Sequence, residues 1–253
     1  MEGRTLTVHC SGPQDVTWND AAPVGPPAEG MVHLWFATLE QLRPRTAFYR
    51  DLLDPVETER AQRFRFKQDR ERFILGHGVL RELLGRYLKR DGSLIRFSRG
   101  AFGKPYLDRK RLCFNFSDTK DAILVGFTTG VEIGVDIETM ARDVDHAAVS
   151  EHYFTAPEIA VIQAAGPEAK RCFLDFWTRK EAVLKASGVG IMEDLRVLRV
   201  DGEHNVMAIE HEAFVKMAAE EYHVRTWHLN NEHIVSLASP KDATLINFRQ
   251  LRS

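Results

Sequence analysis

Apolar residues recur along the chain at two periods, and each period predicts one kind of element. A helical period of about 3.6 residues covers residues 70–89 and again residues 170–186, where glycines follow as stop signals. Residues 54–57 and 155–158 each carry an N-cap, a proline in the first turn and a glutamate three residues after the cap. These signals predict the start of two further helices.

Shorter runs rich in β-branched and aromatic residues predict strands. Two of them, residues 222–229 and 233–237, alternate apolar and polar positions on either side of Asn230-Asn231, which predicts an antiparallel hairpin. The other expected strands cover residues 32–37, 94–97, 112–116, 122–127 and 131–137.

Strands and helices are mixed in both parts of the chain, which predicts the α+β class with a boundary near residue 129. We expect an irregular lead-in over residues 1–30, because glycines and prolines gather between positions 11 and 30. An N-terminal α+β half then covers residues 31–129, and a C-terminal α+β half covers residues 130–253.

Charge is divided unevenly along a chain whose sum is close to zero. The sequence holds 34 Lys and Arg against 36 Asp and Glu, a net charge of −2. Between Arg60 and Arg111 there are 16 basic and 5 acidic residues, so this segment carries +11 and the rest of the chain −13. A cationic segment of this kind indicates an anionic ligand or an acidic partner, and a solvated helix face rich in arginine is the alternative.

Composition excludes several classes of protein. A hydrophobic content of 44% with 28% charged residues is that of a globular chain and not of a disordered one. No apolar run approaches the ~18 residues that span a bilayer, and the first ten residues lack the apolar core of a signal peptide. Cys10, Cys113 and Cys172 are far apart and odd in number, which predicts reduced thiols in a cytoplasmic protein and neither a disulfide framework nor a zinc site.

The five residues from Gly134 to Glu138 are the first candidate for chemistry. In a strand, side chains two apart share a face, so Asp136 and Glu138 project together while Val135 and Ile137 enter the core. Two neighbouring carboxylates repel unless a cation lies between them, and oxygen ligands favour a hard ion such as Mg²⁺ or Mn²⁺. The alternative is an exposed strand end with two solvated acids.

The helix predicted over residues 170–186 carries the second candidate. At about 100° per residue, Glu181 lies just beside the apolar arc, and Lys185 lies one turn further on the same side. This border position suits a carboxylate that is partly buried and still reaches a cleft. A surface ion pair between Glu181 and Lys185 is the alternative, since pairs at this spacing stabilise isolated helices.

These two segments, Gly-Val-Asp-Ile-Glu ending at Glu138 and Trp-Thr-Arg-Lys-Glu-Ala-Val-Leu-Lys ending at Lys185, resemble motifs of the 4′-phosphopantetheinyl transferases. The closer match is the surfactin-type group, in which one chain holds two similar α+β halves with a pseudo-twofold relation. Further segments match in the family's order, and the resemblance covers residues 32–200. These further matching segments are the basic helix with Arg63-Phe64 and Arg72-Phe73-Ile74-Leu75-Gly76, then Phe102-Gly103-Lys104-Pro105, then Phe114-Asn115-Phe116-Ser117.

The resemblance implies a reaction. The 4′-phosphopantetheine arm of coenzyme A is transferred to a serine hydroxyl of an apo acyl or peptidyl carrier protein, and 3′,5′-ADP is released in a reaction that needs Mg²⁺ or Mn²⁺. Such an enzyme is expected to be a cytoplasmic monomer serving fatty-acid, polyketide or nonribosomal peptide synthesis. Neither nucleic acid nor a membrane is expected as a partner.

The resemblance also implies a role for each matching residue. Asp136, Glu138 and Glu181 would hold the metal ion, and Glu181 would accept the serine proton. Lys185 would contact a phosphate oxygen. The residues implied in coenzyme binding are Arg63, Arg72, Lys104, Pro105, Ser117, Asp118 and Lys185.

Position 118 departs from the family pattern. Asp118 stands where the family usually carries a histidine that contacts coenzyme phosphate. An anion there would repel phosphate unless a cation pairs with it or it bonds a ribose hydroxyl. The departure supports a competing hypothesis, a non-catalytic relative that binds coenzyme A or a carrier protein.

Two further alternatives concern other residues. A nucleic-acid-binding module built on the basic segment has no use for the three carboxylates. Glu158 matches an acidic position near the metal in relatives, but its place in a capping box explains it without catalysis.

Overall fold

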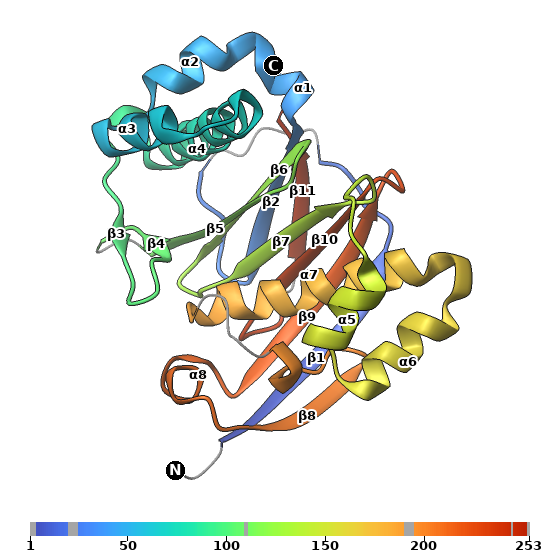
Figure 1. Cartoon of the computed structure of the whole chain (residues 1–253). Coiled ribbons are helices and arrows are strands. Elements are labelled where there is room, and N and C mark those ends of the chain that lie inside the picture. Colours follow the sequence, from blue (N-terminus) through green and yellow to red (C-terminus); the bar gives the residue numbers. More distant parts are fainter. Residues whose placement is uncertain (1–3, 20–24, 109–110, 190–194, 244, 252–253) are drawn as a thin grey trace.

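In the computed structural model of the protein, two β-sheets form the centre of the molecule (Figure 1). The structure describes residues 4–19, 25–108, 111–189, 195–243 and 245–251. The first sheet contains β11 (Leu245–Gln250), β2 (Met31–Thr38), β6 (Ala122–Thr129) and β5 (Leu112–Asp118), in that order. The second contains β7 (Gly134–Thr139), β10 (His233–Ser239), β9 (Glu221–Leu229), β1 (Arg4–Gln14) and β8 (His204–Ile209), and β3 (Ser98–Arg99) pairs separately with β4 (Pro105–Tyr106).

One long helix packs on each sheet (Figure 1). α4 (Lys67–Leu88) buries Leu83 in a cluster with Trp35 and Val125 of the first sheet. α7 (Ala169–Ser187) buries Val183 in a cluster with Ile234 of the second sheet. The other helices are α1 (Leu39–Leu42), α2 (Thr46–Asp51), α3 (Pro55–Arg63), α5 (His146–Tyr153), α6 (Ala156–Ala164) and α8 (Glu212–Met217).

A third buried cluster joins the two sheets to each other. Leu34 of the first sheet and Val135 and Leu237 of the second belong to it. The layers therefore run helix, sheet, sheet, helix, and the predicted α+β fold with two similar halves is confirmed. Among the described residues, no helix combines the length and the apolar character that crossing a membrane requires.

The N-terminal segment corrects one prediction. Residues 4–14 form β1, which pairs antiparallel with β8 and parallel with β9, so the expected irregular lead-in over residues 1–30 is wrong there. Leu6, Val8 and Cys10 alternate on the buried face of this strand. The glycines and prolines that suggested a lead-in begin where the strand ends, and its partners lie far along the chain, with Val8 opposite Asn205.

The C-terminal strand β11 changes the expected boundary. It pairs in parallel with β2 of the first sheet, while β1 belongs to the second, so a division near residue 129 does not separate the two sheets. The strand expected over residues 94–97 is also wrong, because residues 92–94 form a 3₁₀ turn. The other predicted elements are confirmed to within a few residues, including the hairpin, where Asn230 and Asn231 take positive φ angles of 50° and 58°.

Candidate active site

Strand β7 and helix α7 cross closely enough to bring their polar residues together. The apolar side chains of β7 point between the sheets, so Gly134, Asp136 and Glu138 lie on the opposite face, toward α7. A Cβ atom on Gly134 would lie 2.0 Å from the carbonyl oxygen of Ala182, so this approach requires glycine. The crossing puts the acidic face of β7 against α7.

Lys185 links the two elements through a hydrogen-bond network. Its Nζ donates to Asp136 Oδ1 at 2.6 Å and to Ser117 Oγ at 2.8 Å. Ser117 Oγ donates to the same aspartate oxygen at 2.8 Å, and Asn115 Oδ1 accepts the backbone N–H of Val135 at 2.8 Å. Because β5 and β7 belong to different sheets, these side chains take the place of main-chain ladder bonds between the two halves.

Burial and mutual repulsion destabilise the charged forms of the carboxylates. Burial and then the charge of Asp136 raise the pKa of Glu138 to about 7, although Arg142 and Lys185 oppose the shift. The same two causes raise the pKa of Glu181 to about 7. Asp136 is only 5% exposed, and among the described residues its Oδ2 atom has no hydrogen-bond partner. A carboxylate oxygen without a partner is the type of ligand that a hard divalent cation such as Mg²⁺ prefers, so the chemistry of Asp136 suits such an ion.

Positive side chains neutralise two of these carboxylates. Arg142 pairs with Glu138, and Lys185 pairs with Asp136. In the described part of the chain, no group of three His, Cys, Asp or Glu side chains is placed to hold a metal ion. The three residues predicted as metal ligands lie on neighbouring elements, and two of them are paired with cations.

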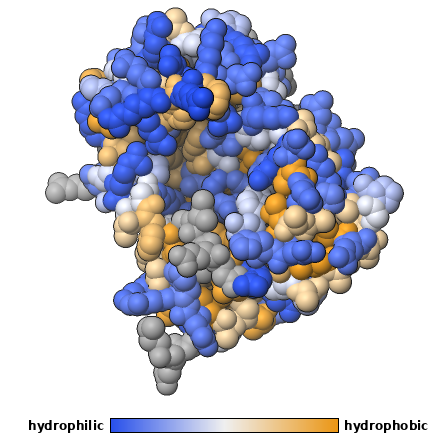
Figure 2. Space-filling model, viewed as in Figure 1, coloured by the Kyte–Doolittle hydropathy of each residue, from blue (hydrophilic) through white to orange (hydrophobic). Residues whose placement is uncertain are grey.

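A recess lies where the two halves meet, and Figure 2 shows the molecule hollowed below the helices at its top. Three adjoining hollows of about 180, 230 and 350 Å³ make up the recess, and Phe116 lines all of them. Lys104, Pro105 and Lys185 line the hollow of about 230 Å³. Lys104 Nζ also lies 2.6 Å from a carboxylate oxygen of Glu132. Predicted coenzyme-binding residues from both halves therefore share this hollow.

The hollow of about 350 Å³ contains two more of the predicted residues, Arg72 and Asp118. Arg72 Nε lies 2.9 Å from Asp118 Oδ2, so the aspartate has a cation beside it. Burial raises the pKa of Asp118, and Arg72 is the main opposing charge. Arg63 is not brought into the recess: its guanidinium pairs with Glu59 and is mostly exposed. Arg60, one turn earlier on α3, lines the hollow.

His77 is a recess residue that sequence analysis missed. Its ring lines both the hollow of about 350 Å³ and that of about 180 Å³, and it stacks on Phe73 with centroids 4.0 Å apart. Glu57 of α3 and Phe116 of β5 are its other neighbours. No local motif marks this position, because those neighbours come from separate elements.

Glu158 has a structural place away from the carboxylates of β7. Its carboxylate caps α6, accepts the backbone N–H of Val200 at 3.1 Å and pairs with Lys180 Nζ at 2.8 Å. The side chains of Glu158 and Lys180 are both 0% exposed. A fully buried pair of this kind ties α6 to α7, and breaking it would leave an uncompensated charge.

The fold and the recess together define an α+β enzyme that combines carboxylates with cations between two halves. Residues 132–238 match the model of the 4′-phosphopantetheinyl transferase superfamily, and residues 35–127 match that of the 4′-phosphopantetheinyl transferase N-terminal region. The chain belongs to the 4′-phosphopantetheinyl transferase superfamily and is an enzyme of that class. The match continues beyond residue 200, where the expected resemblance ended.

Curated relatives support the same assignment. The 4′-phosphopantetheinyl transferase HetI of Nostoc is 34% identical over 173 residues, which span 66% of this chain and 73% of HetI. A putative 4′-phosphopantetheinyl transferase of Synechocystis is 35% identical over 153 residues, or 59% of this chain and 62% of that protein. The 4′-phosphopantetheinyl transferase Sfp of Bacillus subtilis is 23% identical over 215 residues, or 80% of this chain and 91% of Sfp.

Proposed function

We propose that this enzyme transfers the 4′-phosphopantetheine arm of coenzyme A to a serine hydroxyl of an apo acyl or peptidyl carrier protein. The observation that carries the proposal is the crossing of β7 and α7, which joins Lys185 to Asp136 and leaves Glu138 and Glu181 within electrostatic reach of Asp136, beside a hollow lined by Lys104. The serine Oγ attacks the β-phosphorus, the bond from that phosphorus to the bridging oxygen breaks, and 3′,5′-ADP leaves with the bridging oxygen.

Asp136, Glu138 and Glu181 would hold the divalent cation, Mg²⁺ or Mn²⁺. The ion would neutralise charge on the pyrophosphate of the coenzyme. The unpartnered Oδ2 atom of Asp136 supports this role, and Glu138 would exchange its contact with Arg142 for the ion.

The side chains of this chain supply the other functions. Glu181 accepts the proton of the attacking serine, and Lys185 binds a phosphate oxygen. Lys104, which lines the same hollow as Lys185, binds the coenzyme from the N-terminal half. The N-terminal half thus supplies Lys104 to the coenzyme site, and the C-terminal half supplies Lys185 and the three carboxylates. Matches to both halves within one chain support the surfactin-type group. The proposal includes the expectation that the enzyme acts as a cytoplasmic monomer.

Intact-mass spectrometry on a panel of apo carrier proteins tests the proposal. With coenzyme A and Mg²⁺, at least one fatty-acid, polyketide or peptide carrier gains the mass of one arm, and a chelator stops the gain. Binding of coenzyme A without modification of any carrier would instead identify a non-catalytic relative. Salt-sensitive binding of oligonucleotides, with neither coenzyme A binding nor carrier modification, would point to a nucleic-acid-binding module.

A further inference from the structure

Two side chains of α4 in the recess, an arginine and a histidine, are each held by a carboxylate from another element. Arg72 Nε lies 2.9 Å from Asp118 Oδ2 of β5, and a second nitrogen of Arg72 lies 3.2 Å from Asp69. His77 Nδ1 lies 2.9 Å from Glu57 Oε1 of α3. Both Arg72 and His77 line the hollow of about 350 Å³.

Glu57 is itself fixed by a buried cation. The Nε of Arg81, a side chain that is 0% exposed, donates to Glu57 Oε2 at 2.5 Å, and its Nη2 donates to Asp54 at 2.6 Å. Burial opposes ionisation of Glu57, but the hydrogen bonds from His77 and Arg81 hold its pKa below the ordinary value. Glu57 is therefore a carboxylate, and Nδ1 of His77 is the donor to it. Nε2 is then the ring nitrogen that can serve a ligand.

The imidazole of His77 has little freedom to turn. It stacks on Phe73 with an angle of 29° between the rings, and Phe116 lies 5.9 Å away on another side. The bond to Glu57 fixes the ring in its own plane. Such a side chain is oriented before any ligand arrives, which reduces the entropy that binding costs.

Charged groups of both signs surround His77. They are Glu57 and Arg60 from α3, Asp69, Arg72 and Arg81 from α4, Arg99 from β3 and Asp118 from β5. Arg72 neutralises Asp118, and a guanidinium has five N–H donors, so two carboxylate contacts do not exhaust it. Arginine and protonated histidine are both strong donors to phosphate oxygens.

We propose that Arg72 and His77 together bind one phosphate group of coenzyme A, and that Asp118 and Glu57 are positioning residues for these two donors. The inference rests on the proposed function, which supplies the ligand. Asp118 thus strengthens an anion site by positioning Arg72, although its own negative charge repels phosphate.

Calorimetric titration with coenzyme A, without any carrier protein, tests the role of His77. His77→Gln keeps a side chain that can bond Glu57 but removes the second ring nitrogen, Nε2, and we expect at least a tenfold loss of affinity for coenzyme A. His228→Gln is the matched control, since His228 also bonds a carboxylate, Asp175, at 2.8 Å but lies outside the recess.

A double-mutant cycle with the same titration tests Asp118 as a positioning residue. Asp118→Asn weakens coenzyme binding several-fold in the wild type and has little effect when Arg72 is already glutamine. In the transfer reaction the same change raises KM for coenzyme A more than it lowers kcat.

The outcomes separate the two proposals. If the wild type and His77→Gln bind coenzyme A equally well, the proposed phosphate site is overturned, while the transferase function is not affected. An Asp118 effect that persists fully in the Arg72→Gln background shows that Asp118 does not act through Arg72. A wild type that binds no coenzyme A overturns both proposals.

Discussion

The acidic residues of β7 show how far a single position can be predicted from sequence. The alternation along the strand correctly places Asp136 and Glu138 on one face, because side-chain direction depends only on local backbone geometry. Which side chains then lie near them depends on packing: Arg142 near Glu138, and Lys185 and Ser117 near Asp136. Arg142 follows Glu138 by four residues, but Ser117 and Lys185 come from other elements, so no local pattern contains those two.

His33 is a second residue whose surroundings decide its chemistry. It lies in β2 and is 3% exposed, and its Nδ1 accepts a hydrogen bond of 2.7 Å from the hydroxyl of Tyr87. Trp35 Nε1 donates to the same hydroxyl at 2.8 Å, which directs the hydroxyl proton to His33. Burial, with the charge of Arg249, lowers the pKa of His33 from 6.5 to about 4. The folded protein therefore holds this histidine neutral.

Acid should destabilise the protein through His33. The unfolded chain takes up the proton near pH 6.5 and the folded one only near pH 4, so stability is complete above this window and falls as the pH decreases through it. The loss is at most about 3.4 kcal/mol. Urea unfolding at several pH values measures it, and His33→Gln should flatten the pH dependence, whereas substitution of the exposed His152 should not. Equal slopes for the three proteins would exclude His33 as the cause.

At the scale of elements, local signals predict the long helices and miss the strands whose partners are distant. The helical period and the capping boxes locate α3, α4, α6 and α7, because the energy that favours a helix start is local. β1 and β11 were not predicted, because each pairs with strands near the opposite end of the chain. The expected strand over residues 94–97 failed for a different reason: a short apolar run also occurs where the chain turns, and here Leu94 is exposed while Ile95 is buried.

The crossing of β7 and α7 gives a prediction for Gly134. In Gly134→Ala the new Cβ would lie 2.0 Å from Ala182 O and 2.4 Å from Ala186 N, so α7 must move away from β7. We expect a loss of unfolding free energy of about 1–3 kcal/mol and a loss of transfer activity, because Glu181 and Lys185 move with the helix. Gly25→Ala is the control, since nothing lies within 4 Å of its added Cβ. If both variants unfold at the same denaturant concentration and have equal activity, the close crossing of β7 and α7 is not what positions Glu181 and Lys185.

At the scale of the whole molecule, the uneven charge of the sequence is divided across one recess. The segment of net +11 includes Arg60, Arg72 and Lys104, which line it. The carboxylates of β7 and α7 come from the acidic remainder. The sequence therefore indicates both signs of the site in advance. The sequence does not show which residues line the recess. His77 and Arg60 line it, whereas Arg63, one turn after Arg60 on α3, pairs with Glu59 outside it.

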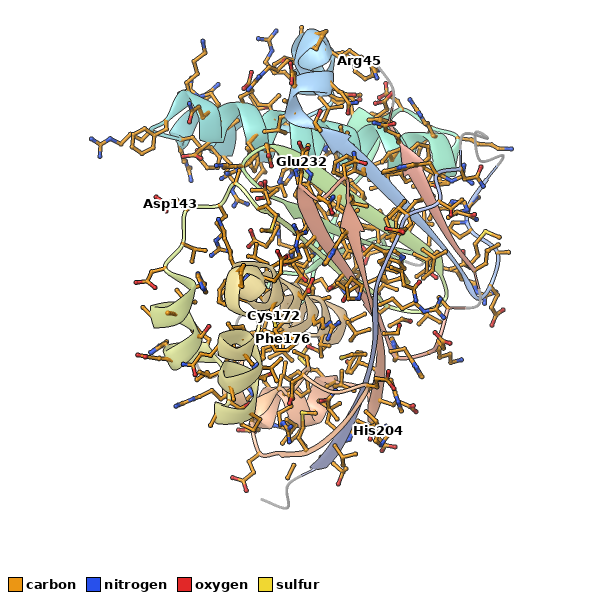
Figure 3. All side chains as sticks on the ribbon, turned by 90° about the vertical axis from the view of Figure 1, so that its right-hand side faces the viewer. Arg45, Asp143, Cys172, Phe176, His204 and Glu232 are labelled. Atoms are coloured by element: carbon orange, nitrogen blue, oxygen red, sulfur yellow. The ribbon has the colours of Figure 1, made fainter. Side chains whose placement is uncertain are left out.

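The junction between the halves is where we expect the transfer to occur, and counting both products tests this function most directly. Holo-carrier and 3′,5′-ADP are measured together for the wild type, for Glu181→Gln and for Glu203→Gln. Glu203 is an exposed control before β8, and its neighbour His204 lies at the end of the molecule opposite Arg45 (Figure 3). The wild type and Glu203→Gln should form the two products in equal amounts. Glu181→Gln should be slower by at least about a hundredfold with an unchanged melting temperature, and a wild-type rate in that variant would contradict the account.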